Sequence, residues 1–166
     1  IVKVLDREAT QGLRPGTLNQ GSATSVRLPD RSVPYVVTDP PYYAAVPYAD
    51  LSDFCYVWLR RMVGELHSDL FRWLLTPKDE EIIAYYVQPP DREPKDGSFF
   101  ENKMKEALSE CKRVLQPDGV AVVLFAHKGT AGWEALLNAL IQAGWTVTSS
   151  WPIETERGAR MRAKNS

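Results

Sequence analysis

Residues 35–51 read YVVTDPPYYAAVPYADL, and this stretch decides how the rest of the chain is interpreted. Its apolar start predicts a short buried strand over 34–39, PYVVTD. Proline has no amide hydrogen for a strand ladder and fixes its own φ, so Pro40 and Pro41 must end that strand. The tyrosines that follow are either core packing or a flat surface for holding a planar ligand.

Composition predicts one globular domain over residues 1–166. The chain is 44% hydrophobic and 25% charged, which is ordinary for a packed domain. No apolar run approaches the roughly 20 residues that cross a bilayer, and no signal-peptide pattern opens the chain, so we expect no membrane partner. The start at Ile1 suggests a fragment or a processed chain. A net charge of −1 means that a nucleic acid would have to be held by a local basic patch.

The cysteines and histidines are too isolated to predict a metal site. Cys55 and Cys111 lack a CxxC or histidine-spaced partner, and His67 and His127 stand alone. Two buried thiols in a reducing cytosol are the simplest interpretation, which predicts a cytoplasmic protein.

Helical spacing of apolar residues predicts four helices. They lie at about 50–65, 68–75, 100–115 and 129–144. We expect Asp50 and Thr130 to be N-caps and Gly144 a C-terminal cap. Residues 1–9 resemble the tail of a further helix. The tryptophans at 58, 133 and 145 are expected in the core.

The unbroken apolar run VAVVLFA at 120–126 predicts a strand buried on both faces, the signature of a parallel sheet. Further strands are expected at 17–20 and 145–153, with turns at 28–32 and 116–119. The proline-rich segment QPPDREPKDGS at 88–98 predicts a flexible surface loop. Strands alternating with helices predict an α/β fold, with a doubly wound, mostly parallel sheet and flanking helices.

Chemistry is expected where the first of these strands ends, because ligands of open parallel sheets bind beyond the carboxyl ends of the strands. Asp39 closes the strand, and the two prolines fix its carboxylate relative to the next carbonyl. Tyr42 offers a flat face beside them. Two acceptors on one amine pull its lone pair out of conjugation with an attached ring, which makes the nitrogen a better nucleophile.

DPPY at 39–42 resembles the catalytic motif of the amino-methyltransferases, which transfer a methyl group from S-adenosylmethionine to an exocyclic amine of adenine or cytosine. Further stretches resemble, in the same order, the C-terminal part of the large prokaryotic adenine-specific DNA methylases that contain a zinc ribbon. These stretches are GSATSVRLPDRS, VPYADLSDF, LLTPKDEEI, KRVLQPDGVAVVLFAHK and WEALLNALIQAGWTVTSSWPI.

The resemblance implies a partial Rossmann-like methyltransferase fold and a role for each residue of the motif. Asp39 and the Pro40 carbonyl would accept hydrogen bonds from the target amine, Pro41 would stiffen the turn, and Tyr42 would stack on a flipped base. GSAT would lie near the adenine of the cofactor. The residues of this loop expected to bind S-adenosylmethionine are Gly21, Ser22 and Ala23.

The sequence also departs from the family's pattern. Ser22 stands where an acidic residue is common, and Ala44 and Ala45 stand where an Asp-Asn pair is usual. Neither a glycine-rich cofactor loop before DPPY nor a zinc ribbon is present. The chain therefore resembles the catalytic C-terminal piece of a longer enzyme, whose remainder would be a partner and without which this piece would be inactive.

Several residues have two open interpretations. Tyr43 and Tyr48 would either stack on a base or pack in the core, and His127 and Lys128 would either face the substrate or end a strand in solvent. A basic cluster would either bind phosphates or form a solvated tail. It consists of Arg157, Arg160, Arg162 and Lys164.

The leading hypothesis is methylation of adenine in DNA. The alternatives are methylation of an RNA base or a glutamine amide, and a non-catalytic nucleic-acid-binding remnant of a methyltransferase.

Overall fold

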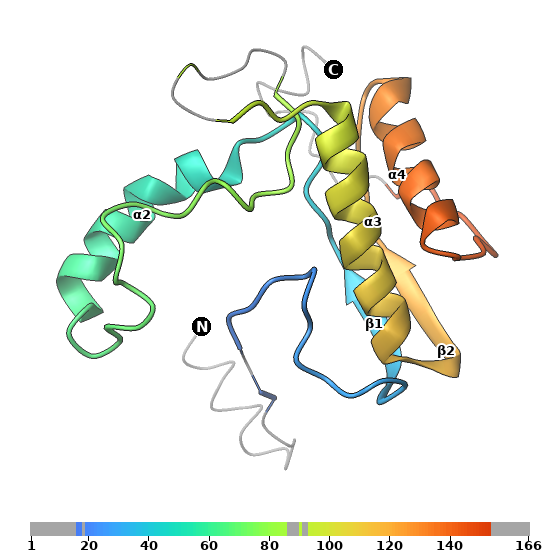
Figure 1. Ribbon diagram of the computed structural model, residues 1–166, viewed down its shortest axis with the longest axis horizontal. Helices are drawn as coiled ribbons and strands as arrows, with labels where there is room; N and C mark the ends of the chain where they lie inside the picture. The colour runs from blue at the N-terminus through green and yellow to red at the C-terminus, as the bar shows by residue number, and fades with distance from the viewer. Residues whose placement is uncertain (1–15, 18, 86–89, 91–92, 154–166) are drawn as a thin grey trace.

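The computed structural model describes residues 16–17, 19–85, 90 and 93–153. The expected helix tail at 1–9 and the basic cluster at 157–164 lie outside these residues. The described chain is a mixed α/β structure with two parallel strands and three helices (Figure 1). In chain order the elements are β1 (Val33–Thr38), α2 (Tyr48–Val63), α3 (Gly97–Val114), β2 (Leu115–Val123) and α4 (Thr130–Gln142).

The expected strand before DPPY and its parallel partner are both confirmed. β1 pairs with β2 in register from Tyr35 opposite Val120 to Thr38 opposite Val123, after an irregularity between Val33 and Tyr35. The turn expected at 28–32 is also present, with the Ser32 hydroxyl donating to the Pro29 carbonyl at 2.7 Å. The turn expected at 116–119 is absent, because these residues follow α3 directly as the irregular first half of β2.

The prediction that the sheet is buried on both faces is wrong for the described residues. Side chains alternate across a sheet, and every second one on β1 and β2 faces away from the core. The exposed fractions are 71% for Tyr35, 71% for Val37, 55% for Val120 and 44% for Val122. No described element covers this face, so the mixed α/β class is observed and a doubly wound arrangement is not.

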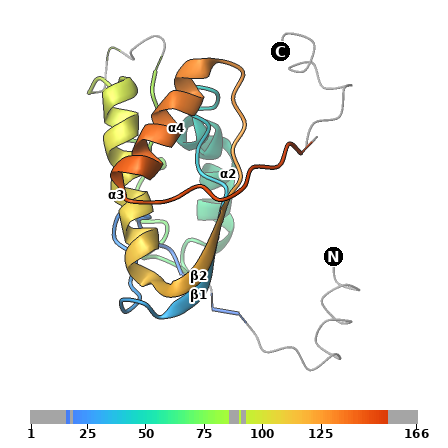
Figure 2. The same ribbon diagram turned by 90° about the vertical axis from the view of Figure 1, so that its right-hand side faces the viewer.

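The core lies between α3 and α4, which run side by side (Figures 1 and 2). The apolar stripe expected on α3 is confirmed: Phe100, Met104, Ala107 and Leu108 are all buried. The Asp96 carboxylate caps the helix by accepting from the Phe99 amide at 2.8 Å. The helix therefore begins at Gly97, inside the segment expected to be a loop.

The C-terminal end of α4 is as expected, but its N-cap lies one residue before the expected one. Its N-cap is Gly129 and no side chain caps it, so the N-cap expected at Thr130 is wrong. At the other end Gly144 has φ 78°. Its amide donates to the Ile141 carbonyl and the next amide, of Trp145, donates to that of Leu140, which is a Schellman motif.

The strand expected at 145–153 does not form, and the described residues of 17–20 are not a strand either. Of the three tryptophans, only Trp145 packs against the core, with its indole N–H donating to the Leu108 carbonyl at 3.0 Å. Trp58 and Trp133 are 54% and 42% exposed, so their expected burial is wrong.

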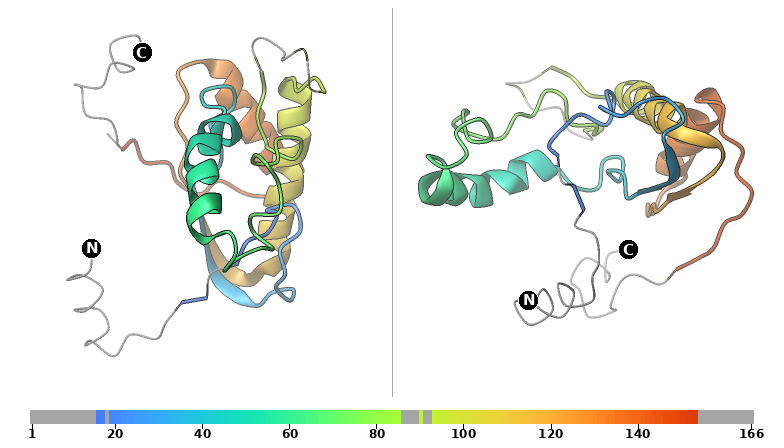
Figure 3. Two further views of the ribbon diagram at one scale, coloured as in Figure 1. Left: turned by 90° about the vertical axis from the view of Figure 1, so that its left-hand side faces the viewer. Right: turned by 90° about the horizontal axis from the view of Figure 1, so that it is seen from below.

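The helix expected at 50–65 is present as α2, but it contributes no buried residue. Figure 3 shows it set apart from the α3–α4 pair, with the following segment running back beside it. Asp50 is not its N-cap, because the helix starts at Tyr48 after Pro47. The helical piece expected at 68–75 is wrong, because these residues form turns and bends.

Candidate active site at the carboxyl ends of the strands

Asp39 follows the last residue of β1 and is exposed. It lines an open hollow of about 290 Å³ together with Pro40, Pro41 and Tyr48, which we call the Asp39 hollow. The carboxylate therefore lies at the carboxyl end of a parallel strand, the position at which ligands of such sheets bind.

Two hydrogen-bond acceptors remain available at this position. Within the described part of the chain, no donor bonds the Asp39 carboxylate or the Pro40 carbonyl oxygen. The preceding carbonyl, of Thr38, is already used, because it accepts from the Leu124 amide of the chain that continues β2. The sheet thus uses the last strand carbonyl, whereas the exposed Asp39 carboxylate and the carbonyl of the buried Pro40 have no donor among the described residues.

The turn after the hollow is strained and firmly held. Tyr43 has φ 50°, a left-handed conformation that costs a bulky residue about 1–3 kcal/mol. Its amide donates to the Pro41 carbonyl at 3.1 Å, and its own carbonyl accepts from Ala84 at 3.4 Å. Its ring lies 5.1 Å from that of Phe100 in the core. This packing favours a structural role for Tyr43.

Aromatic contacts join the turn to the loop that follows β2. Tyr42 lies edge-to-face with Phe125 at 5.7 Å, and Tyr43 lies edge-to-face with His127 at 5.5 Å. The structure thus brings the two segments expected at this edge together. Tyr42 is half-buried and does not line the Asp39 hollow, whereas Tyr48 is 42% exposed and does. Tyr48 is the ring that a ligand in the hollow would meet.

His127 is packed rather than open. Its ring touches Gly132 of α4, and its Nδ1 lies 2.9 Å from the Gly129 carbonyl oxygen. The His127 carbonyl accepts from the Trp133 indole at 2.9 Å. Lys128 is exposed, and neither residue lines the Asp39 hollow. The loop after β2 therefore supports the turn at 41–45 from behind.

The loop expected to bind the cofactor lies elsewhere. Gly21, Ser22 and Ala23 are exposed and do not line the Asp39 hollow. The next residue, Thr24, lines a second hollow of about 550 Å³ along α3. A Cβ added to Gly21 would meet no atom within 4 Å. These residues therefore do not form a cradle that fits S-adenosylmethionine beside Asp39.

An ion pair fastens this loop to α3. The Glu110 carboxylate accepts from the Val26 amide at 2.9 Å, and Arg113 donates to both Glu110 and the Val26 carbonyl. The Arg113 guanidinium lowers the pKa of Glu110 to about 2, and the Val26 amide adds to this effect. Asp30 completes the cluster at 2.5 Å from Arg113.

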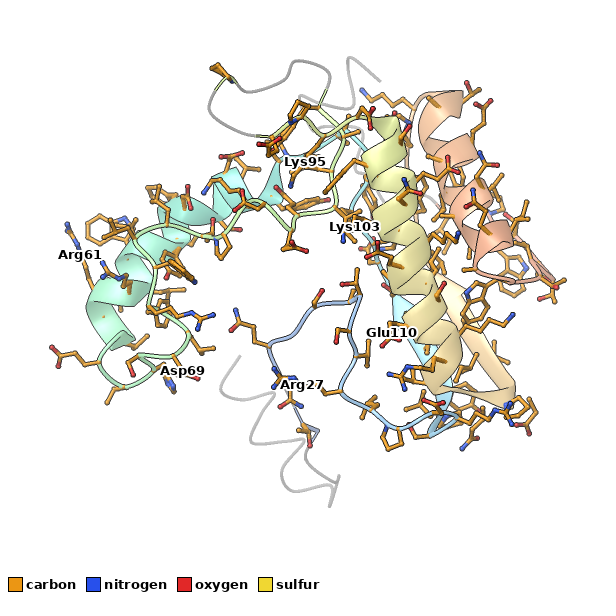
Figure 4. The ribbon with its side chains drawn as sticks, in the orientation of Figure 1. Arg27, Arg61, Asp69, Lys95, Lys103 and Glu110 are labelled. Atoms are coloured by element: carbon orange, nitrogen blue, oxygen red, sulfur yellow. The ribbon has the colours of Figure 1, made fainter. Side chains whose placement is uncertain are left out.

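Sequence reasoning missed two residues that support the site. The Glu81 carboxylate accepts from the Ala49 amide at 2.9 Å, and so caps α2 next to Tyr48. Lys95 is 3% exposed and donates to the carbonyls of Lys78 and Glu81 at 2.5 and 2.8 Å. It lies between the start of α2 and the start of α3 (Figure 4).

Lys95 was expected in a surface loop at 88–98, and its burial contradicts that expectation for this residue. The sequence gives no signal of this burial, because a lysine among prolines and charged residues is typical of a surface loop. Residues 88–89 and 91–92 of that segment lie outside the described chain.

Comparisons with protein-family models, curated proteins and solved structures give no match. Among the described residues, no three His, Cys, Asp or Glu side chains are grouped to hold a metal ion. In the same part of the chain, no helix combines the length and the apolar character needed to span a bilayer.

Proposed function

We propose that this chain carries the amine-binding part of an S-adenosylmethionine-dependent methyltransferase that acts on an exocyclic amine of a nucleic-acid base, with adenine in DNA as the first candidate. One observation carries the proposal. The exposed Asp39 carboxylate follows a parallel strand beside a hollow that Pro40 also lines, and neither this carboxylate nor the Pro40 carbonyl has a hydrogen-bond partner in the described part of the chain.

These two acceptors suit a planar amine. One N–H would donate to the Asp39 carboxylate and the other to the Pro40 carbonyl, which draws the nitrogen lone pair out of the ring system. Tyr48 would lie along the ring, because it is the aromatic side chain that lines the hollow. Asp39 is the carboxylate placed to take the proton that the amine loses, and S-adenosylmethionine, for which the described residues form no cradle beside Asp39, would have to be held by another part of the protein.

A non-catalytic remnant of a methyltransferase is the second candidate. The open loop at Gly21–Ala23, which forms no cradle beside Asp39, favours it. The exposed carboxylate favours catalysis, because a negative charge repels the phosphates that a simple nucleic-acid binder would hold. Both candidates need the hollow to bind a base, and only the first needs the Asp39 carboxylate for methyl transfer.

The first test is recognition of the amine. Fluorescence anisotropy would compare two single-stranded DNA oligonucleotides that differ at one base, adenine or the purine that lacks the 6-amino group. We expect the adenine oligonucleotide to bind about tenfold more tightly, and Asp39→Ala to remove this preference because it removes the acceptor for the amine. Equal binding of both oligonucleotides by the wild-type chain would refute the amine site.

The second test is transfer of a labelled methyl group from S-adenosylmethionine to DNA, RNA or glutamine-containing peptides. With the longer enzyme of which this chain resembles a piece, we expect label in the DNA and none with Asp39→Ala. Preferential labelling of RNA or peptide would reassign the acceptor. Amine recognition without any transfer would support the non-catalytic remnant.

A further inference from the structure

α2 exposes its apolar side to solvent. The residues that form this side recur every three or four positions and define what we call the α2 seam. They are Leu51, Phe54, Cys55, Trp58, Leu59 and Met62. Phe54 and Met62 are 75% and 74% exposed. A helix with such a stripe normally buries it against another element.

The opposite side of α2 contacts residues 71–76, which follow the helix in the chain and which we call the returning segment. The Tyr56 hydroxyl donates to the Trp73 carbonyl at 3.0 Å, and the Arg60 guanidinium donates to that of Phe71 at 3.1 Å. Asp53 accepts from the Thr76 hydroxyl at 2.6 Å. These bonds fix the rotation of the helix, so the seam cannot turn inward without breaking them.

We propose that the α2 seam packs antiparallel against the α2 seam of a second copy of this chain. The charges of the helix select this orientation. Asp50 lies in the first turn and Arg61 in the last, and both flank the seam. Antiparallel packing brings the acidic end of one helix to the basic end of the other, and opposes the two helix dipoles favourably. Parallel packing would pair like charges.

The surface has the size and chemistry of a protein contact. The six side chains of the seam expose on the order of 600 Å² per copy, or about 1,200 Å² in a symmetric dimer, which is the lower end of the range for specific protein interfaces. Residues 48–75 contain three arginines and four carboxylates, so this surface has no excess of positive charge to attract a nucleic acid. Arg61 lies at the far end of the helix (Figure 4), where the partner's first turn would meet it.

The native cysteine provides a direct test of this geometry. With Leu51 opposite Met62 of the partner, the two-fold axis passes near residues 56 and 57. The exposed Cys55 then lies within one helical turn of its symmetry mate, across helix axes about 8–10 Å apart. The other cysteine, Cys111, is half-buried on α3, so the expectation of two buried thiols is wrong for Cys55.

The experiment combines sedimentation equilibrium with a short bis-maleimide cross-linker on the 166-residue chain. We expect a dimer that cross-links through Cys55, and a Cys55→Ser variant that still dimerises without cross-linking. Phe54→Asp should raise the dimer dissociation constant at least tenfold. Its matched control is Ile141→Asp on α4, a residue 68% exposed and outside the seam, which should leave the constant within twofold. Circular dichroism would check that both variants fold.

The orientation has its own test. Arg61→Glu should weaken the dimer, and adding Asp50→Arg should restore it. A monomer at 100 micromolar, a dimer indifferent to Phe54→Asp, or a cross-link through Cys111 would each overturn the proposal. So would a monomer whose Trp58 is shielded from a quencher only when an oligonucleotide is added, because the seam would then be a nucleic-acid surface.

Discussion

The His127 ring, which supports the turn of the candidate site, packs directly against Gly132 in the first turn of α4. There is no space for a side chain at this glycine. A Cβ there would stand 2.5 Å from Cγ of His127 and 2.6 Å from its Nδ1. The imidazole cannot swing away freely, because it packs against Tyr43 and Phe125. We therefore expect Gly132→Ala to destabilise the protein.

The expected magnitude follows from two opposing effects. Overpacking of a confined site costs about 1–3 kcal/mol, and this contact should lie in the upper half because the clash includes Cγ, the ring atom next to the backbone. Replacing glycine by alanine in a helix contributes up to about 1 kcal/mol of stability in the other direction. The net expectation is a loss of about 1–2 kcal/mol in the free energy of unfolding.

Urea unfolding followed by circular dichroism would measure this loss in two backgrounds. In the wild-type chain Gly132→Ala should lower the free energy of unfolding. In the His127→Ala chain the ring is gone, so the same change should be neutral or stabilising. A coupling of about 2 kcal/mol or more between the two positions would support the geometry. A neutral or stabilising Gly132→Ala in the wild type would refute it.

Two further predictions concern the support of α2. Burial raises the pKa of Asp53, but hydrogen bonds from Lys78 and Thr76 outweigh it and hold the pKa near 2. A lowered pKa stabilises the fold above the unfolded value near 4 and loses this contribution as pH falls towards 2. When urea unfolding is compared at pH 5 and 2.5, the loss should be about 1 kcal/mol larger in the wild-type chain than in Asp53→Asn, allowing for solvent screening, because the contribution of Glu110 is lost in both chains. Lys95→Met should cost about 1–3 kcal/mol, because two half-buried carbonyls lose their donor. Lys103→Met, on the surface of α3, should change the same free energy by less than about 0.5 kcal/mol; equal effects of both substitutions would contradict the role of Lys95.

Local rules predicted the elements whose signals are short-range. Two prolines after an apolar run end a strand in any fold, so the end of β1 and the location of Asp39 followed from the sequence. The apolar period of α3 and the glycine after α4 act within one or two turns, and both were confirmed. The strand expected at 145–153 failed, because an apolar run forms a strand only when a neighbour supplies a ladder, and none of the described residues does so.

In the candidate site, too, some features were predicted from the sequence and others were decided by tertiary contacts. Sequence placed Asp39, Pro40 and Pro41 at one edge because they are consecutive, and it left Tyr43 and Tyr48 undecided. Tertiary contacts distinguish these two tyrosines, since one packs on Phe100 and the other lines the hollow. Side-chain direction depends on backbone angles such as the φ of 50° at Tyr43, and no propensity scale predicts a tyrosine there.

By itself, the sequence determined where β1 and α4 end, which side of α3 is apolar and where a carboxylate meets a rigid turn, since these depend on φ restriction and apolar spacing along a few consecutive residues. Only the tertiary structure decided which faces are covered. It buried Lys95 in a segment rich in charge and proline, and left the apolar side of α2 bare. Burial is a property of neighbours distant in the chain, and the pattern of one helix states that it has an apolar side without stating what will cover it.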